Sequence, residues 1–171
     1  MIIIGIDPGL RVTGFGVIEA SGSGARYVAS GCIRAEGSGL PERLRIIYEG
    51  VQSLVELHRP DEAAIENVFM QRNAASALKL GQARGAAICA MVLQSLPVHE
   101  YAPAEIKQAI VGRGGADKAQ VRHMVCALLR LANPPALDAS DALACALSHL
   151  HVSRTRALMA RRVAAAAGSS P

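Results

Sequence analysis

The stretch MIIIGIDPGLRVTGFGVIEA, residues 1–20, decides the fold, and one residue in it does not suit a purely structural strand. Four of the first six residues are isoleucine, and Asp7 follows them. A strand this apolar is normally buried on both faces, as in a parallel or mixed sheet beneath helices. A carboxylate at its end is costly unless cations or hydrogen-bond donors meet it. No Lys or Arg precedes Arg11, so the partner of Asp7 must come from elsewhere in the chain.

The residues after Asp7 predict a turn and two more strands. Asp7-Pro8-Gly9 ends the first strand, because proline cannot donate to a ladder and glycine tolerates positive φ. We expect a second strand over residues 13–19, paired with the first as a hairpin, and a third over 26–34. Gly14 and Gly16 lie two apart, so both lack a side chain on the same face. We therefore expect another element to approach closely there.

Hydrophobic periodicity predicts the remaining elements. Apolar residues at helical spacing indicate helices over 40–57, 74–96, 104–110, 118–131 and 136–151, and short apolar runs indicate strands ending at Glu66 and Tyr101. Three successive strands followed by alternating helices and strands predict an α/β fold, a mixed sheet with helices on both faces.

Composition limits the classes of protein to which the chain can belong. Its 171 residues suit one domain with a sizeable core, and no run of 18 apolar residues could span a bilayer. No basic, apolar leader directs export. The cysteines are scattered and form no CxxC pair, which indicates small buried hydrophobes in a reducing compartment: Cys32, Cys89, Cys126 and Cys145. We therefore expect a cytoplasmic protein without a membrane partner.

The net charge of +4 comes from the C-terminal end. All 14 acidic residues precede Val152, whereas residues 152–171 contain only basic charges, at Arg154, Arg156, Arg161 and Arg162. We divide the chain into a domain over 1–151 and a basic tail over 152–171, helical at first and then flexible. Such a tail favours polyanions. A merely solubilising role is an equal alternative.

Four carboxylates predict a metal centre. Glu66 ends its strand as Asp7 does, and parallel neighbours would bring both acids to the sheet edge where open α/β folds bind ligands. Asp138 and Asp141 share one face of a predicted helix start, where capping is the simpler explanation for one or both. Gathered in one pocket, however, the four would repel by up to roughly 4 kcal/mol per close pair. Divalent cations reverse that repulsion.

The chemistry of these ligands narrows the choice of cation. Carboxylates without histidine suit hard ions such as Mg²⁺ or Mn²⁺. Two such ions about 3.5–4 Å apart activate a water and stabilise the leaving oxygen of a phosphodiester.

Four longer motifs carry a family resemblance. GIDPGxxxTGFG, AIExVFMxxNxxSALKLGQARG, KQAIVGxGxADKxQV and DASDALAxAL together resemble the RuvC-type Holliday-junction resolvases over about residues 1–150. The resemblance implies a ribonuclease H-like fold, a homodimer, and magnesium-dependent paired nicks in two strands of like polarity at a four-way DNA junction. It also implies that Asp7, Glu66, Asp138 and Asp141 are the catalytic, metal-binding carboxylates. Asn67 departs from the family pattern, where Gln is expected, and the tail matches nothing.

The resemblance also assigns DNA contacts. Phe69 is expected at the bases of the junction centre; its simpler interpretation is a plug at the sheet end, but apolar wedges unstack and kink duplexes. Lys118 lies in the first turn of a predicted helix, where a cation opposes the helix dipole, so it needs a reason to be there. The glycine-rich run at Arg113 and Gly114 offers backbone N–H groups to a phosphate. We assign Arg113, Gly114, Lys107 and Lys118 to DNA binding, with a place in the catalytic site as the alternative for the two lysines, although a lysine is usually just solvated at the surface. Lys79 stays open.

The helix over 74–96 has small residues along one stripe, at Ala74, Ala77, Gly81 and Gly85. Packing on its own sheet is the default explanation. The family uses this helix as its dimer contact, and a two-fold dimer matches the symmetry of a junction cut on two strands. The resemblance further implies that a branch-migration helicase complex of RuvA and RuvB supplies the junction.

Two other functions fit parts of the sequence. A phosphotransferase of the actin and sugar-kinase type also places an Asp-x-Gly loop after a strand, but it needs two lobes. A junction-binding module without chemistry would keep the carboxylates only as caps. The histidines show no metal-ligand spacing, and we expect all five to be structural or solvated: His58, His99, His123, His149 and His151.

Overall fold

The structure, a computed structural model, describes residues 1–22, 24–67 and 73–167. The sheet comprises β1 (Ile2–Asp7), β2 (Val12–Ser21), β3 (Gly24–Arg34), β4 (Glu62–Glu66) and β5 (Val98–Tyr101), in the order β3-β2-β1-β4-β5. The three N-terminal strands are antiparallel, whereas β1, β4 and β5 run parallel. The predicted mixed sheet is confirmed.

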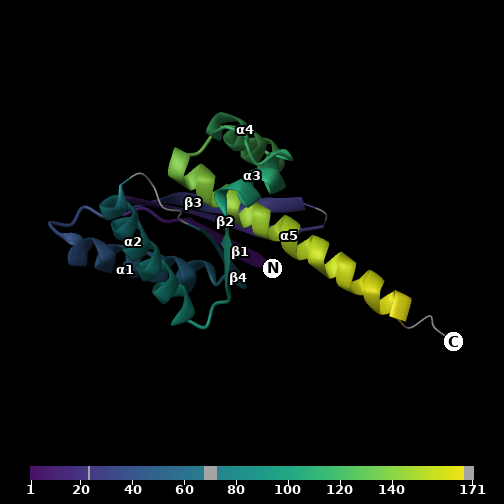
Figure 1. Cartoon of the computed structure of the whole chain (residues 1–171), viewed down its shortest axis with the longest axis horizontal. Helices are drawn as coiled ribbons and strands as arrows, with labels where there is room; N and C mark the ends of the chain where they lie inside the picture. Colours follow the sequence, from purple (N-terminus) through teal and green to yellow (C-terminus); the bar gives the residue numbers. More distant parts are fainter. Residues whose placement is uncertain (23, 68–72, 168–171) are drawn as a thin grey trace.

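Helices cover both faces of this sheet, as predicted (Figure 1). One face carries α1 (Leu40–His58) and α2 (Ala74–Val92), and the other carries α3 (Pro103–Val111), α4 (Lys118–Leu129) and α5 (Leu137–Ala167). The alternation of β1 explains the two layers. Ile4 and Ile6 pack toward α1 and α2, whereas Ile3 packs in the opposite cluster.

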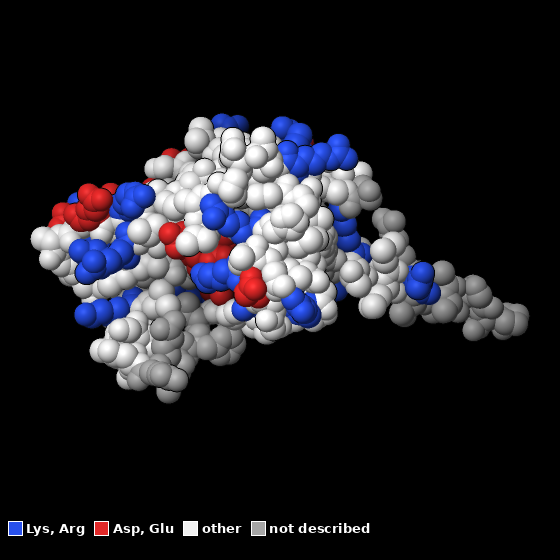
Figure 2. All heavy atoms as spheres, turned by 90° about the horizontal axis from the view of Figure 1, so that it is seen from above, with Lys and Arg blue, Asp and Glu red and all other residues white. Residues whose placement is uncertain are grey.

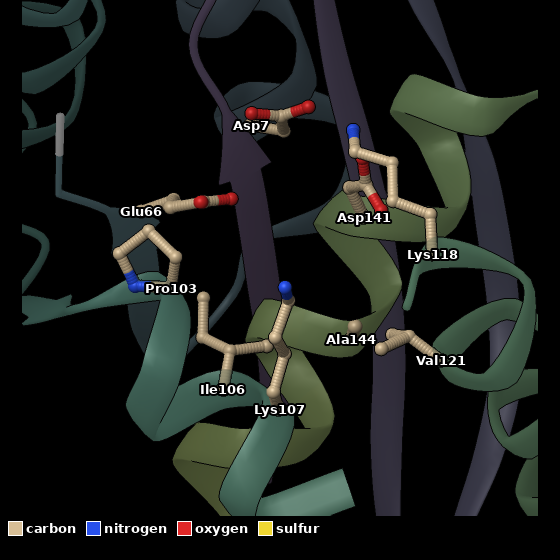
Figure 3. Close-up of a pocket in the computed structure, with 9 residues that line it drawn as sticks. All are labelled: Asp7, Glu66, Pro103, Ile106, Lys107, Lys118, Val121, Asp141 and Ala144. Atoms are coloured by element: carbon tan, nitrogen blue, oxygen red, sulfur yellow. The ribbon is translucent and has the colours of Figure 1, made fainter. Parts of the chain in front are cut away.

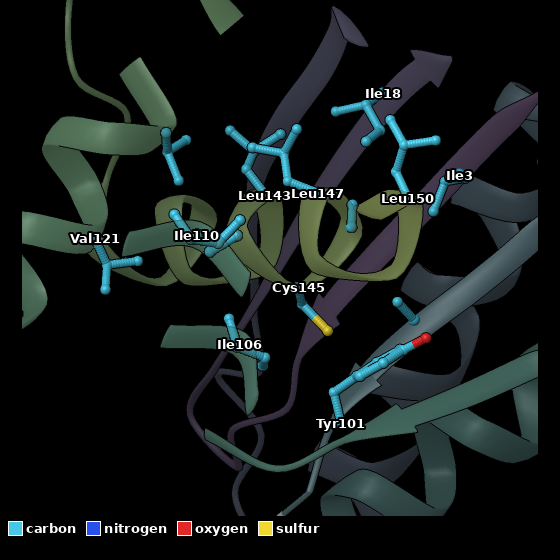
Figure 4. Packing of buried hydrophobic residues seen from close by; sticks show 14 of the residues in the cluster. Ile3, Ile18, Tyr101, Ile106, Ile110, Val121, Leu143, Cys145, Leu147 and Leu150 are labelled. Carbon is cyan, nitrogen blue, oxygen red and sulfur yellow. The ribbon is translucent and has the colours of Figure 1, made fainter. Parts of the chain in front are cut away.

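The α5 side of the core brings together residues from distant parts of the chain. Figure 4 shows Ile3 and Ile18 from the sheet beside Leu143, Leu147 and Leu150 of α5. Residues from α3, α4 and β5 complete the cluster. This packing fixes α5 across the sheet, and with it the acids at its start.

Glycines in β1 and β2 allow α5 to lie directly on the sheet. A Cβ atom on Gly14 would lie 2.0 Å from the carbonyl oxygen of Asp138, and one on Gly5 would lie 2.1 Å from that of Ala142. A Cβ atom on Gly16 would lie 2.6 Å from the side chain of Leu143. The close approach predicted from Gly14 and Gly16 is therefore confirmed, and the approaching element is α5.

The last helix is longer than the predicted 136–151. It continues without a break to Ala167 and extends beyond the sheet (Figure 1). Arg154 donates hydrogen bonds to the carbonyl oxygens of Gly22 and Gly24. The early part of the basic segment is thus helical, as expected, and docks on the β2–β3 turn. The division into a domain and a flexible tail stays a prediction.

The prediction for the cysteines is wrong in part. Cys145 is buried, but Cys32 and Cys126 are half-buried and Cys89 is exposed on α2. All four thiols are free. No helix within the described ranges is long and apolar enough to cross a bilayer.

Candidate active site

Asp7 and Glu66 end neighbouring parallel strands. The register pairs Ile6 of β1 with Ile65 of β4, so the two acids follow at the same level of the sheet. Ile6 and Ile65 both pack toward α1 and α2, and the alternation of the strands therefore turns Asp7 and Glu66 toward α5. The predicted meeting of these acids at one sheet edge is confirmed.

Asp141 of α5 completes a small pocket with these two acids. The pocket has a volume of about 110 Å³, and Figure 3 shows the side chains of Asp7, Glu66 and Asp141 around the same space, from the top, the left and the right of the view. Lys107 of α3 and Lys118 of α4 point into the same space. Seen from above, acidic atoms lie in a hollow in the middle of the molecule with basic atoms beside them (Figure 2).

Asp138 lies one helical turn before Asp141 and outside the residues that line the pocket. Its carbonyl group rests over Gly14, the residue that pairs with Asp7 in the β1–β2 ladder. Its charge contributes to raising the pKa of Asp7. Asp138 is therefore near the acidic pocket without lining it.

Burial and repulsion between carboxylates raise the pKa values of Asp7 and Glu66. Burial raises the pKa of Asp7 to about 8, and the charges of Glu66 and Asp141 add to that rise, whereas Lys118 opposes it. Burial also raises the pKa of Glu66; Asp141 adds to this rise, and Lys118 and Lys107 oppose it. Burying three carboxylates this close together is unfavourable when all are ionised. The arrangement therefore indicates a site that binds positive charge.

A contact with Asp141 explains why Lys118 stands in the first turn of α4. Its ammonium group lies 2.6 Å from the carboxylate of Asp141, and this hydrogen bond raises the pKa of Lys118. Asp117 caps the same helix, accepting from the N–H of Gln120, whose side chain accepts from the N–H of Asp117. Lys118 is thus placed by α4 as a counter-ion to the acids.

Arg113 and Gly114 do not join the acidic pocket. Gly114 borders a separate groove between α3 and α5, together with Gln108 and His151. In the loop that contains both residues, the N–H of Gly112 donates to Gln108 and that of Ala116 donates to Arg113. Their assignment to DNA stays a prediction, and Phe69 lies outside the described residues.

Two residues that position the acids were not predicted from the sequence. Arg84 of α2 donates to the carbonyl oxygen of Glu66 (3.1 Å) and to the side-chain oxygen of Asn67 (2.7 Å), and it also pairs with Glu100. Asn67, the departure from the family pattern, is thus held at the strand end. An arginine in a helix otherwise rich in small residues was the available signal.

The second such residue is Thr13, which is fully buried. Its hydroxyl donates to the carbonyl oxygen of Gly9 and accepts from the N–H of the same residue. This pair of bonds closes the loop that follows Asp7 and holds the end of β1 in place.

The small-residue stripe of α2 does not pack on its own sheet. The helix instead buries Ala83, Ala87, Ala90 and Met91. Gly81 and Gly85 have open space where a Cβ atom would stand. The default explanation for the stripe is therefore wrong.

Comparison with known proteins identifies the family. The family model described as crossover junction endodeoxyribonuclease RuvC matches residues 3–149. The chain belongs to the RuvC family. It is 60% identical over 161 residues to the crossover junction endodeoxyribonuclease RuvC of Methylococcus capsulatus, covering 94% of this chain and 97% of that protein.

Solved structures of RuvC agree with this assignment. The Thermus thermophilus RuvC structure is 34% identical with a TM-score of 0.82, and that of T. thermophilus RuvC in complex with Holliday junction substrate is 34% identical with a TM-score of 0.86. Each alignment covers 91% of this chain and 96% of the other. The expected ribonuclease H-like fold is confirmed.

Family membership also settles the class of activity. The protein is a structure-specific endonuclease that resolves Holliday junctions by paired, metal-dependent nicks in recombination and repair. The alternatives of a phosphotransferase and of a binding module without chemistry are therefore set aside.

Proposed function

We propose that Asp7, Glu66, Asp138 and Asp141 bind two Mg²⁺ ions and form the centre that nicks the junction. The convergence of Asp7, Glu66 and Asp141 on one pocket is the observation that carries this proposal. The donors are all carboxylate oxygens, which suit Mg²⁺, and Mn²⁺ is expected to substitute. Bound ions of this kind activate a water and stabilise the leaving oxygen of a phosphodiester.

The side chains around the acids have separate tasks. Asp7 and Glu66 supply ligands from rigid strand ends, while Asp138 and Asp141 supply them from one face of α5. Positive charge arriving at the acids would weaken the hold of Asp141 on Lys118. Lys118 is then free to meet a DNA phosphate at the mouth of the pocket, with Lys107 beside it.

Four-way junction DNA, to which a solved relative is bound, is the substrate that tests the proposed centre. The decisive assay is nicking of a synthetic four-way junction by the wild type, Asp7→Asn and Glu36→Gln, each with Mg²⁺ and with EDTA. Glu36 is exposed and distant in sequence from the acids, so its variant is a matched loss of one charge.

We expect magnesium-dependent nicking by the wild type and Glu36→Gln, and junction binding without nicking by Asp7→Asn. Full activity of Asp7→Asn would contradict the assignment of the catalytic acids. Equal activity in Mg²⁺ and EDTA would contradict the proposed ions.

We further propose a homodimer that uses the outer face of α2. Open space at Gly81 and Gly85 and the exposure of Leu78 (66%) support a helix that receives a partner. A Cβ atom at Gly81 has nothing within 4 Å among the described residues, and we expect Gly81→Leu to fold and to sediment as a monomer at micromolar concentration. Ser53→Leu, on an exposed position of α1, is the control and should remain a dimer.

The family resemblance supports the remaining partners. We propose that the helicase complex of RuvA and RuvB supplies the junction and that the protein acts in the cytoplasm. We also propose that Phe69, Arg113 and Gly114 contact the junction DNA together with the two lysines.

A further inference from the structure

A second cluster of metal-ligating side chains lies away from the acidic pocket. Glu62 of β4, His99 of β5 and His149 of α5 offer three ligand atoms within 4.8 Å of one another. His149 is 2% exposed, and Glu62 and His99 are half-buried. The histidines are 50 residues apart in sequence, which is why their spacing did not predict a site.

The position of the cluster follows from the periods of strand and helix. Glu62 and Glu66 lie on the same face of β4, four residues apart, or about 13 Å. Asp141 and His149 lie on the same side of α5, eight residues apart, or about 12 Å. The same two elements therefore carry the acidic pocket at one end and this cluster at the other.

His149 has the surroundings of a histidine that ligates a cation. Its Nε2 atom lies 2.5 Å from the carboxylate of Glu62, and its Nδ1 atom lies 2.7 Å from the hydroxyl of Tyr101. Metal-binding histidines use one ring nitrogen as the ligand and donate the other N–H to an oxygen. Tyr101 supplies that oxygen from a buried position on β5.

Burial and the neighbouring basic groups favour the neutral ring of His149. Burial lowers the pKa of His149; the charges of His99 and Arg156 act in the same direction, and the hydrogen bond that Glu62 accepts from His149 opposes them. A neutral imidazole has the free electron pair that a cation needs. Glu62 supplies one negative charge to compensate the cation.

We propose that Glu62, His99 and His149 form a second cation site, which takes one Zn²⁺. Imidazole and carboxylate donors suit Zn²⁺, whereas Mg²⁺ prefers the all-oxygen set of the acidic pocket. Ligand chemistry thus separates the two sites.

Binding requires small movements of the half-buried side chains. Ligand atoms about 2.0–2.1 Å from a tetrahedral ion lie about 3.3 Å apart, so the Glu62 carboxylate must withdraw slightly. The imidazole proton must also move from Nε2, where the ion binds, to Nδ1, from which it is donated to the Tyr101 hydroxyl. The rings of His99 and His149 now stack with centroids 4.4 Å apart. A ring nitrogen of His99 lies within 4.8 Å of the other two ligand atoms, so this ring must also move toward the ion. The ion would then join β4, β5 and α5.

The test is calorimetric titration of the full chain with Zn²⁺ in excess Mg²⁺, so that the acidic pocket is occupied. A Cys89→Ser background removes the exposed thiol. We expect one Zn²⁺ per chain, and replacement by Co²⁺ should give the visible absorption of a site with nitrogen ligands. Binding should also raise Tm.

Variants separate this site from the acidic pocket. His99→Ala and Glu62→Gln should each weaken Zn²⁺ binding at least tenfold, while His99→Ala keeps magnesium-dependent nicking. His123→Ala, an exposed histidine of α4, and Asp7→Asn should bind as the parent does. No binding by the parent, unchanged binding by His99→Ala and Glu62→Gln, or loss of binding in Asp7→Asn would each overturn the proposal.

Discussion

Replacing Asp7 by Asn should stabilise the metal-free protein while it destroys nicking. Folding raises the pKa of Asp7 from 3.8 to about 8, so the folded chain holds this proton more tightly than the unfolded chain does. The contribution of this group to stability is therefore complete below pH 3.8 and is lost as the pH rises toward 8. Each pH unit corresponds to about 1.4 kcal/mol.

The size of the effect follows from that interval. Ionised Asp7 is more favourable in the unfolded chain than in the folded one. At pH 7 this difference lowers the free energy of unfolding of the wild type by up to about 4 kcal/mol. Asn has nearly the same shape and never ionises. Allowing for relaxation of the pocket and for solvent that reaches it, we expect Asp7→Asn to be about 2–4 kcal/mol more stable than the wild type at pH 7 in EDTA.

Urea unfolding in EDTA at pH 5, 6, 7 and 8 measures this difference. The advantage of Asp7→Asn should grow with pH and reach its maximum near pH 8, while Glu36→Gln should follow the wild type throughout. Saturating Mg²⁺ should remove the advantage, because only the wild type offers the ions the full set of carboxylate ligands and is therefore stabilised by binding them. Equal stabilities of Asp7→Asn and the wild type at pH 8 in EDTA would refute the account of the acidic pocket.

Three further predictions concern packing and DNA. Gly14→Ala should lose about 3 kcal/mol in urea unfolding and most of its nicking activity, because its Cβ atom meets the backbone of Asp138; an unchanged variant would show that α5 can shift freely. Phe69→Ala should fold normally but nick junctions roughly tenfold more slowly or worse, since stacking on a base contributes about 1–3 kcal/mol; a normal rate would remove Phe69 from the DNA contacts. Junction affinity, measured by fluorescence anisotropy, should fall about 10³-fold or more between 50 and 200 mM salt, and Lys118→Ala should reduce that slope; a flat response would argue against a phosphate-binding surface.

The sheet and the acids at its edge could be predicted because local patterns specify them. The isoleucine run of β1 and the short apolar run before Glu66 indicate buried strands, and each acid is the first polar residue at a strand end. Parallel pairing then brings the acids together without further information. A close approach at Gly14 and Gly16 could also be predicted, because these glycines leave one face of β2 bare, but the sequence did not indicate that α5 is the approaching element.

Contacts between elements far apart in the chain could not be predicted in this way. The longer last helix is different, because residues 152–167 have a helix-forming composition without glycine or proline, and this local pattern indicates the extension. Arg84 reaches the end of β4 from α2, and although an arginine among small residues stands out, the sequence does not indicate Glu66 as its partner. His99 and His149 meet only because β5 and α5 are both placed by the sheet.

Arg84 connects the outward-facing helix α2 with the end of β4 at the acidic pocket. Its helix presents Gly81 and Leu78 outward, toward the proposed second chain, while its guanidinium holds the carbonyl of Glu66 on the inner side. Any displacement of α2 on association must therefore be transmitted to that strand end. Single and associated chains should therefore differ in the shape of the acidic hollow.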